Sequence, residues 1–186
     1  MSHVIDKTFE FCYGHRVWTQ KLNGEYAADL KCACRHMHGH EGKMQVFLTA
    51  PDLDATGMVT DFRHLEWLKK WINEHIDHQF ILDHSDPLYR QLLLRESTGM
   101  VPPIAPVFVP GTDMIAGYNL DLTGIEPNTP EYEYYEGFFL VDFVPTSENL
   151  SSWMAKIVEA KMKALNVTVQ RIEWWETPRS RSSFTL

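Results

Sequence analysis

The feature that most constrains the fold is a short histidine motif, His38-Gly39-His40, in a segment whose flanks have the composition of a β-strand. Because side chains on a strand alternate between two faces, His38 and His40 point the same way, with backbones about 6–7 Å apart. Two imidazoles at that separation can hold one metal ion together, and we expect Gly39 to keep bulk away from it. The motif therefore predicts a strand with one metal-binding face.

A zinc ion needs at least one further protein ligand. His36 lies about 13 Å from His40 in extended chain, which is too far for both to reach one ion. One parity of residues 4–15 is apolar and ends in an imidazole: Phe9, Phe11, Tyr13 and His15. We therefore predict His15, from a second strand, as the third ligand.

Length and charge narrow the class of protein. The chain has 186 residues and 44% hydrophobic content, which is typical of one globular domain with its own core. Its formal net charge of −8 argues against nonspecific binding to nucleic acid or to an anionic membrane, because both depend on basic surface. Chemistry on a small molecule is favoured.

The cysteines and the lack of a targeting pattern indicate the cellular compartment that we expect for the protein. The sequence has three cysteines, an odd number, and Cys32 and Cys34 are too close for an easy disulfide. The first residues lack the basic and apolar regions of a signal peptide, and no apolar run is long enough for a membrane span. We expect a cytoplasmic protein with reduced thiols and treat Cys12 as a core residue.

The periodicity of apolar residues predicts an α+β fold. Strands are expected over residues 4–15 and 43–49. A helix is expected from the N-cap Asp61, with one buried face formed by Phe62, Leu65, Leu68, Ile72 and Ile76. A second helix should begin at residues 145–148 and end near Asn166, and a closing strand should cover residues 167–176.

The segment between the helices, residues 83–144, is different. Seven of the ten prolines lie there, so long helices are not expected across most of it. Strands are predicted over residues 106–109 and 137–143, as a hairpin or extended loop inserted into a single domain of residues 1–186. Residues 178–186 are expected to form a polar tail.

Six motifs occur in the order found in one known family. They are Phe11-Cys12-Tyr13-Gly14-His15-Arg16, the Cys-x3-His-Gly-His of residues 34–40, Gly57-Met58-Val59-Thr60-Asp61-Phe62, Ile76-Asp77-His78, Pro145-Thr146-Ser147-Glu148 and Trp175-Glu176-Thr177. With these motifs, residues 4–82 and 144–178 resemble the 6-pyruvoyltetrahydropterin synthase family. The resemblance is closest to the bacterial 6-carboxy-5,6,7,8-tetrahydropterin synthases of queuosine biosynthesis.

The resemblance implies a tunnelling fold (T-fold), in which an antiparallel sheet carries two helices on one face. It also implies a ring, usually a homohexamer, with active sites between subunits. Zn²⁺ would be bound by His15, His38 and His40. The substrate would be 7,8-dihydroneopterin triphosphate, converted to 6-carboxytetrahydropterin with release of acetaldehyde and triphosphate by a lyase reaction.

The resemblance also assigns roles to four other residues. Cys34, Asp77 and His78 match the catalytic positions, and a thiolate or a carboxylate-oriented imidazole is suited to moving protons beside a metal. Glu176 matches the residue that anchors the pterin, because a carboxylate can accept two parallel donors from its guanidine-like edge. Glu173, on the opposite parity, is expected to be solvated.

Three questions stay open at this point. Cys32 precedes the histidine motif by six positions, as in the pyruvoyl-forming branch, whereas Cys34 has the carboxy-forming spacing of four; a regular strand would put both on one face. The alternatives to the carboxy-forming reaction are triphosphate elimination alone and a noncatalytic pterin-binding assembly protein. The triphosphate has four candidate contacts near the motifs: Arg16, Lys31, Arg35 and Lys43.

Overall fold

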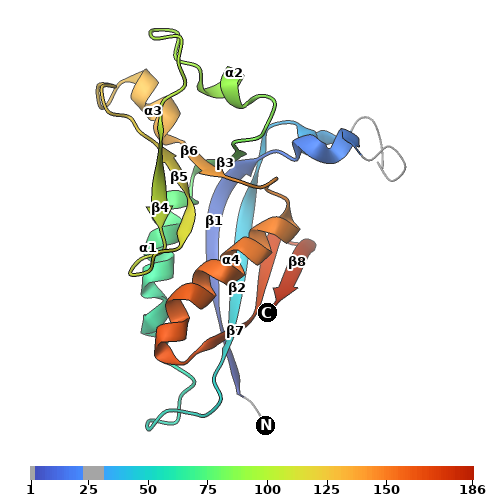
Figure 1. The fold of residues 1–186 in the computed structure, drawn as a ribbon. Helices are drawn as coiled ribbons and strands as arrows, with labels where there is room; N and C mark the ends of the chain where they lie inside the picture. The colour runs from blue at the N-terminus through green and yellow to red at the C-terminus, as the bar shows by residue number, and fades with distance from the viewer. Residues whose placement is uncertain (1–2, 23–31) are drawn as a thin grey trace.

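The computed structural model describes residues 3–22 and 32–186. Its centre is an eight-stranded sheet in the order β4-β5-β6-β3-β1-β2-β7-β8 (Figure 1). The long hairpin of β1 (Val4–His15) and β2 (His38–Thr49) occupies the middle, with His15 opposite His38 and Tyr13 opposite His40. Since directly opposed residues of an antiparallel pair share a face, this register brings the three histidines and Tyr13 to one side of the sheet.

The C-terminal side of the sheet is antiparallel. β7 (Thr168–Thr177) pairs with β2, and β8 (Ser180–Thr185) pairs with β7. The closing strand is therefore present, while the segment expected to be a polar tail is an edge strand. Its polar composition suits an edge that has one row of unpaired backbone groups.

On the other side of β1 the sheet becomes parallel, so the antiparallel sheet that we expected is in fact mixed. β3 (Gln79–Asp83) pairs in parallel with β1 and with β6 (Phe138–Val141). Helix α1 (Glu66–His75) lies between β2 and β3 in the sequence and returns the chain to the direction of β1. A parallel pair requires such a crossover. The predicted order of strand, helix and strand did not determine that β3 would pair in parallel with β1.

Both predicted helices are present and begin at the expected caps. The Asp61 carboxylate accepts the backbone N–H of Arg63 at 2.8 Å and starts a 3-10 turn, Phe62–Leu65, that continues into α1. Thr146 accepts the N–H of Asn149 at 3.2 Å and caps α4 (Ser147–Met162). Short 3-10 turns cover Trp18–Leu22, Ala33–Arg35 and Lys163–Leu165. Within residues 3–22 and 32–186, no helix has the length and apolar character needed to cross a membrane.

The main core lies between these two helices and the face of the sheet that carries the histidines. It joins apolar side chains of β1, β2, α1, α4 and β7, including Phe9, Phe11, Tyr13, Met44, Val46, Leu68, Ile72, Met154, Ile157 and Trp174. Figure 1 shows α4 crossing in front of β2 and β7. The opposite face of β1, β2 and β7 carries no helix of the described chain.

Residues 83–144 extend the sheet rather than forming a plain loop. They contain α2 (Tyr89–Leu93), β4 (Ile104–Phe108), β5 (Ile115–Leu120), α3 (Pro130–Glu136) and β6. The two strands expected here are present, and β5 is a third. A side chain at Gly117 would meet the Phe139 ring at 2.5 Å, so this glycine lets β5 approach its neighbour. A smaller apolar cluster, with Leu82, Leu93, Leu120, Tyr135 and Leu140, supports the extension.

Candidate metal centre and active site

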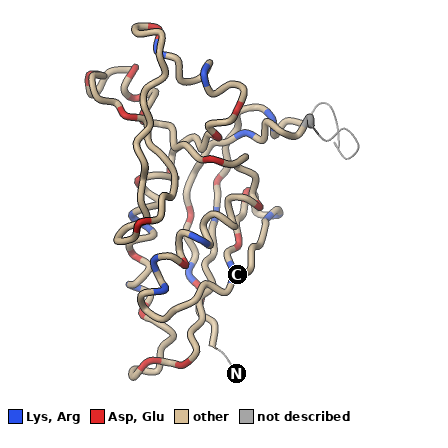
Figure 2. The backbone as a smooth tube through the Cα atoms, viewed as in Figure 1, with Lys and Arg blue, Asp and Glu red and all other residues tan. Residues whose placement is uncertain are grey.

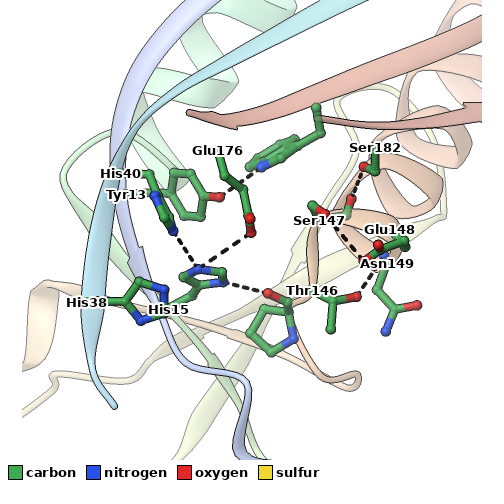
Figure 3. Close-up of polar contacts among 12 residues, drawn as sticks. Tyr13, His15, His38, His40, Thr146, Ser147, Glu148, Asn149, Glu176 and Ser182 are labelled. Carbon is green, nitrogen blue, oxygen red and sulfur yellow. Dashed lines mark hydrogen bonds and ion pairs between the residues drawn. The ribbon is translucent and has the colours of Figure 1, made fainter. Parts of the chain in front are cut away.

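Three imidazoles converge at one end of the β1–β2 hairpin (Figure 3). His15 is the last residue of β1, and His38 and His40 open β2. One ring nitrogen from each of the three lies within 4.8 Å of the other two, which makes them a group that could hold a metal ion. Gly39 lies between His38 and His40 on the strand and therefore faces the other side of the sheet, so it does not keep bulk away from the space between the imidazoles as expected.

Backbone carbonyls fix the orientation of the imidazoles. His15 Nδ1 lies 2.6 Å from the carbonyl oxygen of Pro145, and His38 Nδ1 lies 2.8 Å from that of His36. Because a carbonyl only accepts, each Nδ1 carries the proton and each Nε2 keeps a lone pair. His15 Nε2 and His40 Nε2 are 3.1 Å apart. A cation between these nitrogens satisfies the converging lone pairs, so the donor set fits a metal ion.

The protonation state of the histidines also suits metal binding. Burial lowers the pKa of His15 to about 4, with a smaller opposing contribution from the hydrogen bond to Pro145. Burial also lowers the pKa of His40, together with the charge of His38, while a hydrogen bond to the Glu176 backbone acts in the opposite direction. Metal ligation requires neutral imidazoles. The fold therefore holds His15 and His40 in the form that a metal ion needs.

Glu176, near the end of β7, points into the same site. Its Oε1 lies 3.7 Å from His15 Nε2, and its side chain is 26% exposed. Burial raises the pKa of this carboxyl, and the negative charge of Glu148 at the start of α4 adds to the effect. Within residues 3–22 and 32–186, no lysine or arginine side chain is bonded to this half-buried carboxylate, which is therefore suited to accepting donors from a ligand.

Tyr13 and Trp174 form the floor beneath these groups, a role that sequence reasoning did not assign. The Trp174 Nε1–H donates to the Tyr13 hydroxyl at 2.9 Å, and the Tyr13 ring packs against those of His15 and His40 at 5.2 and 5.6 Å between centroids. Burial raises the pKa of Tyr13, so its hydroxyl stays protonated. The shared strand parity of Tyr13 and His15 was the sequence signal that could have placed Tyr13 next to the histidines.

Cys34 lies on a 3-10 turn, Ala33–Arg35, rather than on the strand. The regular strand that would put both cysteines and both histidines on one face is therefore absent. Cys34 is exposed, its thiol interacts with that of Cys32, and the charge of Glu176 reaches it. Burial and the neighbouring Cys32 raise the pKa of Cys34, whereas a hydrogen bond from the Cys34 backbone lowers the pKa of Cys32. The pKa values of the two thiols therefore depend on each other.

Asp77 and His78 do not join the histidines of their own chain. They form a second group with Cys12, whose backbone N–H donates to Asp77 Oδ1 at 2.8 Å. Cys12 is exposed rather than in the core, because its parity is opposite to that of Tyr13 and His15. The sheet therefore separates this group from the imidazoles. His78 has a φ of 60°, a left-handed conformation that is costly for a residue other than glycine and is concentrated at functional sites.

Glu173 is buried, contrary to the expectation that it would be solvated. On the helix-free face its carboxylate pairs with Arg171 at 3.2 Å and with Arg181 of β8 at 3.3 Å. The segment that carries Arg181 was not expected to be a strand, so the cover that it gives to Glu173 was missed. Glu173 and Glu176 thus occupy different environments within one strand.

Comparisons with known proteins agree with this architecture. The family model described as 6-pyruvoyl tetrahydropterin synthase matches residues 4–185. A protein of Aquifex aeolicus named 6-carboxy-5,6,7,8-tetrahydropterin synthase is 34% identical over 194 residues, covering 99% of this chain and 98% of its own. An uncharacterised Wolinella succinogenes protein of known structure has 41% identity and a TM-score of 0.83, with 100% of this chain and 98% of that chain covered.

A more distant structure shows the same fold. The 6-pyruvoyl tetrahydropterin synthase of Caenorhabditis elegans has a TM-score of 0.58 at 16% identity and covers 100% of this chain and 96% of its own. The expected T-fold of the α+β class is therefore confirmed. With a family model that spans nearly the whole chain and a full-length relative above 30% identity, this chain belongs to the 6-pyruvoyl tetrahydropterin synthase family.

Proposed function

We propose that the protein is a zinc-dependent 6-carboxy-5,6,7,8-tetrahydropterin synthase of the queuosine pathway. It would convert 7,8-dihydroneopterin triphosphate to 6-carboxytetrahydropterin, acetaldehyde and triphosphate. The observation that carries the proposal is the convergence of three imidazole nitrogens within 4.8 Å, with the Glu176 carboxylate 3.7 Å from one of them. The near full-length similarity to the Aquifex aeolicus protein of that name supports the choice of reaction.

His15, His38 and His40 are the residues that would hold the zinc. The ring orientations of His15 and His38 are set by the carbonyls of Pro145 and His36 at 2.6 and 2.8 Å, so these two Nε2 atoms are oriented before an ion arrives. When bound, zinc supplies a Lewis acid that polarises hydroxyl and carbonyl oxygens. Three neutral ligands leave its charge largely uncompensated, and this favours the polarisation.

Glu176 would orient the substrate. Its carboxylate can accept two parallel donors from the guanidine-like edge of the pterin. Because Glu176 lies next to His15 and above the Tyr13–Trp174 floor, a pterin bound there directs its side chain toward the histidines. The carboxylate would thereby fix the position of the pterin ring relative to the histidines.

Cys34 would act as the general base that takes a proton from the substrate side chain, as its match to the family's catalytic cysteine implies. The positive charge of a bound zinc would favour its thiolate and oppose the burial and neighbouring groups that raise the pKa of Cys34. Asp77 would orient and charge-stabilise His78, which would serve as the second acid and base. Their place on the opposite face of the sheet means that they cannot reach the substrate of their own chain. We propose that they serve a neighbouring subunit in a ring, a hexamer by family resemblance.

Identification of the products tests the reaction. Purified protein loaded with zinc is incubated with 7,8-dihydroneopterin triphosphate, and acetaldehyde and triphosphate are both quantified. Equal amounts of the two support the carboxy-forming reaction. Release of triphosphate without acetaldehyde would instead identify a pyruvoyl-forming synthase.

A mixing experiment tests the shared active site. Cys34→Ala and His78→Ala are prepared separately, dissociated and reassembled together. If each site takes Cys34 and His78 from different chains, random reassembly restores about a quarter of wild-type activity. No recovery above the two separate variants would place both residues in one chain's site. A noncatalytic pterin-binding protein would have no turnover for either substitution to remove.

A further inference from the structure

A second group of metal-ligating side chains lies on the helix-free face of the sheet. Cys12 of β1 and Asp77 and His78, from the turn between α1 and β3, each offer one ligand atom, and these three atoms lie within 4.8 Å of one another. All three residues line a pocket of about 560 Å³. We call this group the thiol site. It shares no residue with the three imidazoles, and its donors are chemically different from theirs.

Backbone hydrogen bonds fix the turn of the thiol site against β1. The His78 N–H donates to the Cys12 carbonyl at 2.7 Å, and the Cys12 N–H donates to Asp77 Oδ1 at 2.8 Å. His78 takes its left-handed conformation, with a φ of 60°, between these two bonds. They use one oxygen of the Asp77 carboxylate, so the other oxygen can bind a ligand. The backbone therefore brings the three side chains together before any ion binds.

The separations in the thiol site suit a tetrahedral divalent cation. Zinc binds sulfur at about 2.3 Å and nitrogen or oxygen at about 2.0–2.2 Å, so the ligand atoms around it lie about 3.3–3.7 Å apart. His78 Nε2 lies 3.8 Å from Asp77 Oδ1. Because the Cys12 and His78 side chains are exposed, small rotations can close the remaining distances, and water can supply the fourth ligand.

The charge of the thiol site also suits a divalent cation. A cysteine that binds a metal ion is a thiolate, so the site would supply two negative charges, from sulfur and carboxylate, and one neutral imidazole. Figure 2 shows acidic residues on both central strands. Two of them, Glu10 and Glu41, line the same pocket, and Glu41 is the direct cross-strand partner of Cys12. Lys43, which also lines the pocket, lies 4.0 Å over an indole ring.

We propose that Cys12, Asp77 and His78 bind a second zinc ion, more weakly than the candidate metal centre binds the first. A thiolate and an imidazole favour zinc over magnesium and calcium, which prefer oxygen ligands. In the candidate metal centre, backbone carbonyls orient two of the rings in advance. The exposed Cys12 and His78 side chains must lose rotamer freedom when they bind, and the thiol must also release its proton. The thiol site should therefore fill only after the candidate metal centre.

Under the proposed function, the second ion would lower turnover. His78 would exchange protons with the substrate of a neighbouring subunit, and an imidazole nitrogen that binds zinc cannot take up a proton. The rate should rise until about one ion is bound per chain and then fall in proportion to the occupation of the thiol site. This effect rests on the proposed function, whereas metal binding by the thiol site does not.

Titration of the reduced, metal-stripped protein with cobalt tests the thiol site without any turnover. Cobalt is the probe because a thiolate bound to it gives a charge-transfer absorption band in the near ultraviolet, which imidazole ligands do not give. Wild type should bind about two ions per chain, and the band should grow only as the second ion binds. Cys12→Ala should lose the band and one ion. His15→Ala should lose one ion and keep the band.

Two further variants control for the choice of thiol and for misfolding. Cys34→Ala removes another exposed thiol and should keep both ions and the band. His78→Asn removes the imidazole but keeps the left-handed backbone, which asparagine tolerates, and it should lose the second ion as Cys12→Ala does. The inference is overturned if wild type binds a single ion, if Cys12→Ala and His78→Asn both keep the second ion, or if Cys34→Ala alone loses the band. If the second ion depends on Cys12 but excess zinc leaves acetaldehyde formation unchanged, the proposed role of His78 fails and the thiol site stands.

Discussion

Replacement of Glu176 by glutamine tests how the site recognises its substrate. Glutamine keeps the shape of the side chain but turns one of its two acceptors into an N–H₂ donor, which then faces a donor of the pterin. Hydrogen bonds to a charged group contribute about 1.5–3 kcal/mol, so loss of the carboxylate should lower kcat/KM by about 10- to 150-fold. The zinc content should not change, because the three imidazoles are not altered.

The same substitution should also change how the stability of the metal-free protein depends on pH. Burial raises the pKa of Glu176, so in the metal-free protein the folded state holds this proton more tightly than the unfolded state does. The resulting stabilisation is complete below the unfolded pKa and is lost as the pH rises through the folded pKa. Between about pH 4 and pH 8, roughly the window in which a carboxyl with a raised pKa titrates, metal-free wild type should lose stability as the pH rises. Because glutamine does not ionise, metal-free Glu176→Gln should lose less stability than wild type over this window, as measured by thermal unfolding.

Glu173→Gln is the matched control. It removes the same charge from the same strand, but on the face where Arg171 and Arg181 contact the carboxylate at 3.2 and 3.3 Å. This variant should unfold at a lower temperature and keep its kcat/KM. Wild-type kcat/KM in Glu176→Gln, or an equal loss in both variants, would refute the assignment of Glu176 as the pterin anchor.

Three further tests, two of them with a second variant for comparison, address separate parts of the site. His15→Ala should abolish stoichiometric zinc binding in equilibrium dialysis, whereas His36→Ala should retain it, because His36 orients His38 only through its backbone carbonyl; equal zinc binding by both would contradict the ligand set. Cys34→Ala should lower kcat by about 100-fold or more with zinc retained, as for loss of a general base; the same loss in Cys32→Ala with an active Cys34→Ala would transfer the role to Cys32. Tyr13→Phe leaves the buried Trp174 N–H without its acceptor and should cost about 1–3 kcal/mol in the free energy of unfolding by urea; no change would mean that water replaces the hydroxyl.

Local patterns in the sequence were sufficient to predict much of the central hairpin and the position of its histidines. The alternation of residues 4–15 put Tyr13 and His15 on one face, and the structure brings His15 opposite His38. The caps Asp61 and Thr146 were also readable, because a side-chain acceptor at a helix start acts on residues two or three positions away. These features depend on near neighbours in the chain.

Features that depend on long-range pairing were not predicted. The parallel pairing of β3 depends on where α1 delivers the chain, and the burial of Glu173 depends on the arrival of β8. The separation of Asp77 and His78 from the histidines arises in the same way, since it follows from the face of β1 on which the turn after α1 lands. The Ala33–Arg35 turn interrupts the strand parity on which both cysteines were compared.

The most direct test of the central claim is a zinc titration of the stripped protein with acetaldehyde as the readout. Protein freed of metal by chelation receives increasing zinc, and both bound zinc and acetaldehyde formation from 7,8-dihydroneopterin triphosphate are measured at each point. If His15, His38 and His40 form the working metal centre, acetaldehyde formation should rise linearly and reach a plateau at about one ion per chain. Full acetaldehyde formation by the stripped protein, or none at saturating zinc, would contradict a zinc-dependent carbon–carbon lyase.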